Sequence, residues 1–142
     1  MGKVRGLSGI LRNMSIYSKQ LRSDLTLEVF KATTNIEGKA KNRVPVDTGK
    51  LKQSIYHKMD YSKAIGQVGA TEDYAPYIEF GTGGNVAVPN GFSELASEFK
   101  GKGKRKINRS PKPFLIPAFL EETQNLKEET KRVVKKYSGL NR

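Results

Sequence analysis

The sequence predicts a single α+β domain over residues 1–142, in which a long N-terminal helix precedes a small antiparallel sheet with a β-hairpin, a long basic loop, and a C-terminal helix packed on the sheet. Three observations lead to this prediction. Apolar residues recur every three or four positions from Ile10 to Ala40, which is typical of one helical stripe. Two short strand-like runs follow at 55–59 and 64–70, and a second helical pattern occupies 117–137.

Composition and charge exclude several classes of protein. The chain has no cysteine and one histidine, His57, which excludes disulfides, a cysteine nucleophile and a multi-histidine metal centre. We therefore expect no cofactor. No apolar run approaches the ~20 residues of a membrane span and no secretory signal is apparent, so we expect a soluble, untargeted protein. The net charge of +12 is concentrated in the first 50 and last 42 residues, which suggests contact with a polyanion or an acidic protein surface, unless the lysines only aid solubility.

The N-terminal part combines an arm and a long helix. Residues 1–9 hold three glycines among basic residues and are predicted to form a flexible arm. The helix is expected over Ile10–Arg43, with a break permitted by the low-propensity residues between Thr33 and Gly38. If continuous, it is about 50 Å long. A compact chain of this size has a radius of gyration of about 14 Å, so the helix is expected to extend beyond its own core and to expose apolar surface to a neighbouring subunit.

The stretch from Val44 to Ile55 is the hinge of the chain. Pro45 disfavours helical backbone at Val44, so the long helix should end there. Asp47 and Thr48 offer side-chain oxygens to the N–H groups of a new helical turn that begins here. Local physics alone favours a helix-to-helix corner without chemistry, because Asp-Thr-Gly is common in turns. The same tripeptide surrounds aspartic protease carboxylates, but the second carboxylate motif is absent.

The next part is predicted to be a hairpin followed by an aromatic turn. Residues 60–63 form the turn between strands 55–59 and 64–70. The stretch 71–82 is dense in aromatic residues and is expected to help form the core. Glu79 lies among apolar residues there, and we expect it to be hydrogen-bonded or paired with a Lys or Arg, because no second carboxylate or histidine is placed to make it a catalytic acid.

The stretch from Gly83 to Pro113 is predicted to be a long loop insertion with at most a short helix over 93–99. Its second half concentrates seven cations within thirteen residues: Lys100, Lys102, Lys104, Arg105, Lys106, Arg109 and Lys112. Such a segment could bind phosphates by charge alone or could be a solvated surface loop. After it, Pro117 is well placed in the first turn of a helix that runs to about Tyr137 and ends at Gly139.

Three blocks stand in fixed order in this chain. They are residues 43–55 (Arg-Val-Pro-Val-Asp-Thr-Gly-Lys-Leu-Lys-Gln-Ser-Ile), 74–82 (Tyr-Ala-Pro-Tyr-Ile-Glu-Phe-Gly-Thr) and 113–118 (Pro-Phe-Leu-Ile-Pro-Ala). Together they resemble the HK97 gp10-like family of tailed-bacteriophage neck and tail-completion proteins, over roughly residues 10–137. The resemblance assigns structural roles to Pro45, Asp47, Thr48, Gly49, Leu51, Tyr74, Tyr77, Glu79, Gly81, Thr82, Pro113, Phe114 and Pro117.

The resemblance implies a structural virion protein with no cofactor. Such a subunit is expected to be made in the host cytoplasm and to form a homo-oligomer, a hexameric ring, that joins the tail to the DNA-filled head beside other neck and tail proteins. The basic loop, with Lys100, Lys102, Lys104, Arg105, Lys106 and Arg109, is then expected to face packaged DNA non-specifically or an acidic surface of an adjoining ring. The stretch 83–109 is longer and more basic than a minimal member needs, so the resemblance says least about this loop.

Two other classes remain as alternatives. A stand-alone, non-specific nucleic-acid-binding protein of phage origin would use the basic flanks, although no helix-turn-helix, RNA-binding aromatic motif or zinc pattern is present. An enzyme has the least support, because no carboxylate pair or nucleophile–base arrangement is apparent.

Overall fold

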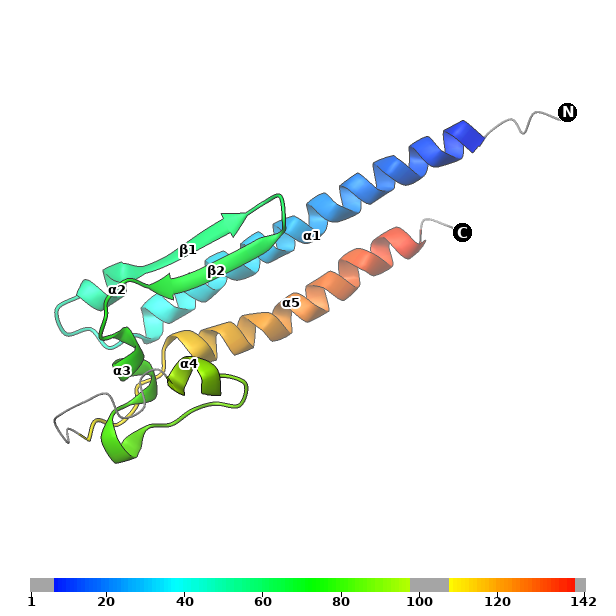
Figure 1. The fold of residues 1–142 in the computed structure, drawn as a ribbon. Coiled ribbons are helices and arrows are strands. Elements are labelled where there is room, and N and C mark those ends of the chain that lie inside the picture. Colours follow the sequence, from blue (N-terminus) through cyan, green and yellow to red (C-terminus); the bar gives the residue numbers. More distant parts are fainter. Residues whose placement is uncertain (1–6, 98–107, 140–142) are drawn as a thin grey trace, which may run out of the picture.

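Two long antiparallel helices carry a β-hairpin near one end, as Figure 1 shows. The computed structural model describes residues 7–97 and 108–139. In chain order the elements are α1 (Leu7–Arg43), α2 (Lys50–Ser54), β1 (Ile55–Asp60), β2 (Ile65–Ala70), α3 (Ala75–Phe80), the 3₁₀ turn η1 (Gly83–Asn85), α4 (Ser93–Ser97) and α5 (Leu115–Ser138). The predicted α+β class is therefore confirmed, with a sheet of two strands within the described ranges.

Helix α1 is continuous from Leu7 to Arg43, so the break permitted between residues 33 and 38 does not occur. The threonines are accommodated because Thr33 and Thr34 donate their hydroxyls to the carbonyls of Val29 and Phe30, one turn earlier. The helix begins three residues before the predicted start, so residues 7–9 are helical and not part of an arm, while residues 1–6 lie outside the described part. It ends before Pro45, as predicted.

The hinge forms the expected second helix but uses a different cap. Helix α2 has Gly49 at its N-cap with a φ of 77°, and no side chain caps it. Asp47 and Thr48 therefore do not supply the predicted cap. A left-handed backbone favours glycine, because a Cβ would be strained there. The glycine turns the chain directly into α2, which leads into β1.

The hairpin lies on α1 in the predicted place, within one residue at each strand end. The strands pair antiparallel with Ile55 opposite Ala70 and Asp60 opposite Ile65. Asp60 stabilises the turn, because its Oδ1 accepts hydrogen bonds from the Ser62 N–H at 3.0 Å and the Ser62 hydroxyl at 2.6 Å. The sheet approaches the helix closely at Gly66, where a Cβ would lie 1.8 Å from Thr33 Oγ1.

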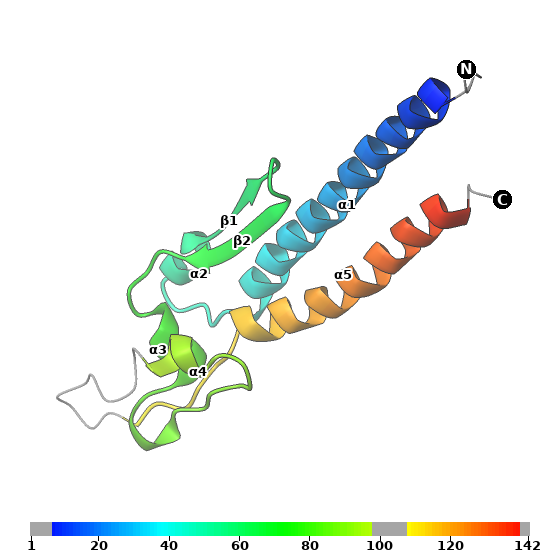
Figure 2. The same cartoon turned by 45° about the vertical axis from the view of Figure 1, so that its right-hand side comes forward.

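Helix α5 runs antiparallel to α1 (Figure 2). Leu115, in its first turn, packs with Val68 and Ala70 of β2 against the core. The predicted packing of this helix on the sheet is confirmed, and α1 is its more extensive partner. The helix begins at Leu115, two residues before the predicted start. Pro117 is tolerated because the first turn of a helix has no intrahelical acceptor for its N–H groups.

The core is confined to the end of the helix pair that carries the hairpin. One cluster joins all the major elements there: Ile36, Ala40, Val44, Leu51, Ile55, Ala75, Ile78, Phe114 and Ala118. A second, smaller cluster of Phe80, Ala96 and Ile116 holds part of the 83–113 stretch against α5, with Val86, Val88 and Phe92 packed on it. That stretch contains the short α4 helix, as predicted, and its residues 98–107 lie outside the described part.

Both long helices extend beyond this core. Among the side chains that the structure describes, none in α1 before Ala32 is buried and none in α5 after Glu122 is buried. At 1.5 Å per residue, about 37 Å of α1 precedes Ala32. The overhanging helix expected from the sequence is therefore present.

Candidate functional site

The hinge block and the aromatic block meet on one surface. A depression of about 300 Å³ is lined by Pro45, Asp47, Thr48, Gly49, Lys50, Leu51, Tyr74, Ile78 and Arg109. We call it the motif depression. Six of its nine lining residues are positions to which the family resemblance assigned structural roles, and Arg109 comes from the predicted basic loop. The other predicted loop cations, from Lys100 to Lys106, lie outside the described residues.

Arg109 is fixed beside this depression by its backbone. The Thr82 N–H donates to the Arg109 carbonyl at 3.0 Å, and the Arg109 N–H donates to Thr82 Oγ1 at 3.0 Å. Nearby, the Lys112 N–H donates to the Ile78 carbonyl at 2.8 Å. These bonds hold the returning chain against α3. Gly81 allows the turn, because it ends α3 with a φ of 79°.

Glu79 joins the aromatic block to the third block. Its side chain is 6% exposed, and its Oε2 accepts the N–H groups of Phe114 at 2.8 Å and Leu115 at 2.9 Å. Its Oε1 accepts the Ile116 N–H at 2.9 Å. The side chain of Phe114, the N-cap residue of α5, makes no capping hydrogen bond. The Glu79 carboxylate on α3 caps α5 instead, although it lies 35 to 37 residues earlier in the sequence. The prediction that Glu79 is hydrogen-bonded is confirmed, with backbone donors instead of a Lys or Arg.

Other residues of the second and third blocks lie close to the start of α5. Tyr77 is half-buried on α3, and Pro113 is exposed and leads into Phe114, which is 1% exposed. Phe114 therefore anchors the start of α5 in the core. The three blocks are thus brought together by α2, α3 and the first turn of α5.

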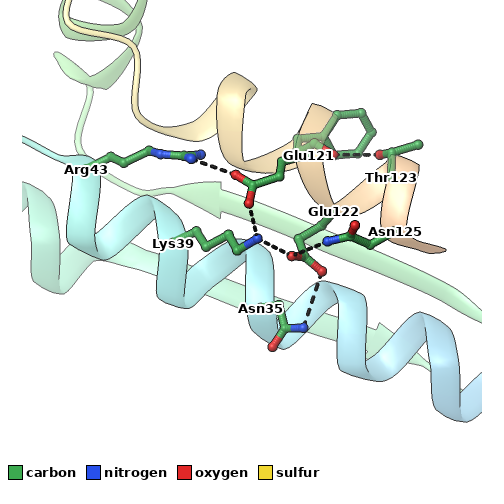
Figure 3. A network of polar contacts seen from close by, with 8 residues as sticks. Asn35, Lys39, Arg43, Glu121, Glu122, Thr123 and Asn125 are labelled. Atoms are coloured by element: carbon green, nitrogen blue, oxygen red, sulfur yellow. Dashed lines mark hydrogen bonds and ion pairs between the residues drawn. The ribbon is translucent and has the colours of Figure 1, made fainter. Parts of the chain in front are cut away.

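A polar network that sequence reasoning missed connects the two long helices (Figure 3). Lys39 Nζ lies 2.5 Å from both Glu121 Oε1 and Glu122 Oε1, and Arg43 Nη2 lies 2.6 Å from Glu121 Oε2. Glu122 is almost buried, and the Asn35 side chain donates to its Oε2 at 3.3 Å. The spacing of Lys39 and Arg43 places both cations on one helix face, but nothing in the sequence shows that this face meets α5.

The network perturbs the acids and the lysine in opposite directions. Hydrogen bonds from Lys39 and then Arg43 lower the pKa of Glu121 below its ordinary value. Burial raises the pKa of Glu122, but the bonds from Lys39, Asn35 and Asn125 outweigh it and lower the pKa overall. Glu121 and then Glu122 raise the pKa of Lys39. All three groups are thus charged near neutral pH, and the network is an ionic clamp between α1 and α5.

The motif depression and its surroundings show no grouping of side chains typical of catalysis or metal binding among the described residues. In the motif depression, Asp47 has no second carboxylate or histidine among the lining residues. Within the ranges 7–97 and 108–139, no three His, Asp or Glu side chains are grouped to hold a metal ion. His57 instead contacts Glu37 on α1, which also pairs with Lys41. None of the described helices combines the length and apolar character needed to cross a bilayer.

The comparison with protein families decides the relationship. Residues 8–81 match the family described as "Bacteriophage HK97-gp10, putative tail-component", which is just over half of the chain. The chain belongs to the HK97-gp10-like family. No curated protein and no solved structure matches it.

Membership in the HK97-gp10-like family makes this chain a bacteriophage tail component and not an enzyme, and it implies other virion proteins as partners. The matched region runs from α1 to Gly81, so it contains the hinge block and nearly all of the aromatic block. The third block lies beyond the match. Glu79 connects the two parts, because a residue inside the matched region holds the start of the helix outside it.

Proposed function

We propose that this tail component is a tail-completion or neck subunit that joins the tail to the DNA-filled head as a homo-oligomeric ring of six copies. The observation that carries the proposal is the helix pair that extends beyond the core. Apolar side chains remain exposed on it and beside it: Ile16 is 43% exposed, Leu27 48% and Tyr61 62%. Leu27 and Tyr61 line one depression, and an exposed apolar patch is typical of interfaces with other protein chains.

One part of that surface suits a protein partner especially well. Leu27, Phe30 and Tyr61 line a depression of about 440 Å³ where the hairpin turn meets α1, and Lys19 and Arg22 also line it. The rings of Phe30 and Tyr61 lie 6.1 Å apart. Aromatic residues and arginine are enriched at protein interfaces. In a ring, every copy would present the same surface, so one contact is repeated around the assembly.

Native mass spectrometry of the purified chain tests ring formation. We expect a ring species for the wild type and its loss in Ile16→Ser and Leu27→Ser. Val46→Ser is the control, because Val46 is an exposed aliphatic residue outside both long helices. A helical circular dichroism spectrum shows that each variant is folded. Rings that persist in both helix variants would contradict the proposed interface.

At the level of the virion, removal of the protein should produce full heads beside unattached tails. This phenotype is expected because the joining step would be blocked after DNA packaging and tail assembly are complete. Electron microscopy of particles from a phage that lacks the protein measures it. Normally joined particles would contradict a role at the head–tail junction.

The basic loop is proposed to face DNA or an acidic surface of an adjoining ring. Its described member, Arg109, is exposed and fixed by Thr82 beside the motif depression. The test is the salt dependence of duplex DNA binding by the wild type and by a variant in which Lys102, Lys104, Arg105 and Lys106 are changed to Ser. Loss of several phosphate contacts should flatten the dependence. Unchanged weak binding would remove the DNA part of the proposal, whereas DNA binding by a monomer that never assembles would favour a stand-alone nucleic-acid-binding protein.

A further inference from the structure

The outer edge of β2 is a free strand edge within the described residues. The Thr71 N–H donates to the Ser54 carbonyl at 3.2 Å. The odd-numbered residues of β2 therefore direct their backbone N–H and C=O groups toward β1. Backbone groups alternate along an antiparallel strand. Gly66, Val68 and Ala70 therefore direct their N–H and C=O groups away from β1, to an edge on which no second described strand lies. Such an edge can accept another strand.

A groove runs along this edge. Two adjoining depressions of about 430 and 420 Å³ share Val68, Leu95, Leu115 and Ile116, and together they follow the chain from Gly66 to Asp73. We call this the β2 groove. Its far wall is formed by α4 and the first turns of α5, where Leu95 is 55% and Phe119 43% exposed. The groove therefore has β2 on one side and helices on the other.

The end of the β2 groove is acidic. Glu72 and Asp73 line it, directly after β2. Neither side chain forms an ion pair with another described residue, and Asp73 is exposed. An extended segment that carries cations would therefore pair its backbone with β2, as strand-addition ligands do, and its charges with these two carboxylates.

Residues 1–6, Met-Gly-Lys-Val-Arg-Gly, have the matching chemistry. They equal β2 in length, they carry Lys3 and Arg5 with no acidic residue, and their two glycines allow a close backbone approach. They cannot reach the groove of their own chain. Six extended residues span at most about 22 Å, whereas Leu7 lies about 39 Å along α1 from Thr33, which touches Gly66.

We propose that residues 1–6 of a second copy bind as a strand in the β2 groove, with Lys3 and Arg5 beside Glu72 and Asp73. The inference rests on the proposed assembly of copies and names one of its contacts. The contact is heterologous, because the arm of one copy enters the groove of the next. Such contacts form a ring where the rotation between copies closes and an open filament where it does not.

Disulfide trapping tests the proposal cleanly, because the chain contains no cysteine. Full-length chains with Val4→Cys or, separately, Lys3→Cys are mixed with chains carrying Thr71→Cys, whose position is exposed between β2 and Glu72. Adjacent strand residues face opposite ways, so one of the two arm positions should meet residue 71 when Lys3 and Arg5 lie beside the two carboxylates. The control is Ser54→Cys, whose carbonyl accepts the Thr71 N–H and which lies one chain further from the groove. The extra ~4.8 Å places it beyond disulfide reach of the arm.

We expect a crosslinked dimer with Thr71→Cys and none with Ser54→Cys. We expect Glu72→Gln with Asp73→Asn to slow its formation about five-fold, as the loss of two partly exposed ion pairs would. Equal crosslinking of both positions, or none, overturns the proposal. So does an intrachain crosslink between Lys102→Cys and Thr71→Cys in one chain, which would assign the groove to the basic loop. Native mass spectra of the same samples distinguish the arm contact from the proposed ring. Assembly without the crosslink overturns only the arm contact. Crosslinked dimers without larger species support the arm contact and contradict the ring.

Discussion

Replacement of Glu79 by glutamine should destabilise the fold far more than its conservative chemistry suggests. The carboxylate accepts three backbone N–H groups at the start of α5, at 2.8, 2.9 and 2.9 Å. A glutamine oxygen can keep the two bonds now made by Oε2, but as weaker neutral ones. Its amide nitrogen would then face the Ile116 N–H, so that a buried donor meets a donor.

The magnitude follows from these contacts. Leaving one buried N–H without an acceptor costs about 1–3 kcal/mol, and loss of the charge weakens the two remaining bonds by about 0.5–1 kcal/mol each. We expect Glu79→Gln to lower the free energy of unfolding by about 3 kcal/mol. For a chain of this size the thermal midpoint should fall by about 10 °C. Urea and thermal unfolding followed by circular dichroism measure both quantities.

The control is Glu128→Gln, the same chemical change on the same helix. The Glu128 side chain is 54% exposed and pairs, among the described residues, with Lys131 at 3.2 Å, so the expected loss is about 0.2–0.5 kcal/mol. Hydrogen exchange gives a local readout, because the N–H groups of residues 114–116 should exchange faster in Glu79→Gln alone. If the free energies of unfolding of Glu79→Gln and Glu128→Gln differ by less than about 0.5 kcal/mol, the capping role is refuted.

Two further predictions concern the packing and the charges of α1. Gly66→Ala should destabilise the fold by about 1–3 kcal/mol through overpacking, because the new Cβ would lie 1.8 Å from Thr33 Oγ1 and 3.0 Å from Thr33 Cβ. Gly38→Ala, where nothing lies within 4 Å, should instead stabilise α1 by about 0.5–1 kcal/mol, and equal effects in urea unfolding would contradict the close approach. The pKa of Glu121 is lowered by Lys39 and Arg43 from its ordinary value of 4.5, so its contribution to stability is present above that value and is lost as the pH falls through the folded-state pKa. Stability measured from pH 6 to pH 3 should therefore decline less steeply in Glu121→Gln than in the wild type, and identical slopes would remove Glu121 from the clamp.

Much of the local structure could be read from the residues alone. The 3.6-residue period marked both long helices, Pro45 marked the end of α1, and the hairpin strands were placed within one residue. The permitted break at residues 33–38 was wrong, because the threonine hydroxyls bond to carbonyls of the preceding turn and the helix continues. The cap at the hinge was also wrong. Left-handed backbone at Gly49 leads directly into α2, and that conformation depends on how the chain must turn to reach β1.

For the candidate site, too, the sequence predicted some features and the structure alone revealed others. The order of three short blocks was sufficient to indicate the family, and the family match over residues 8–81 contains the first block and nearly all of the second. That Glu79 caps α5, that Lys39 meets Glu121 and Glu122, and that buried packing stops near Ala32 became visible only in three dimensions. Periodicity and turn chemistry act over a few neighbouring residues and are written in the chain itself. Contacts between residues 35 to 87 positions apart depend on which faces the folded backbone brings together, and no local pattern specifies that choice.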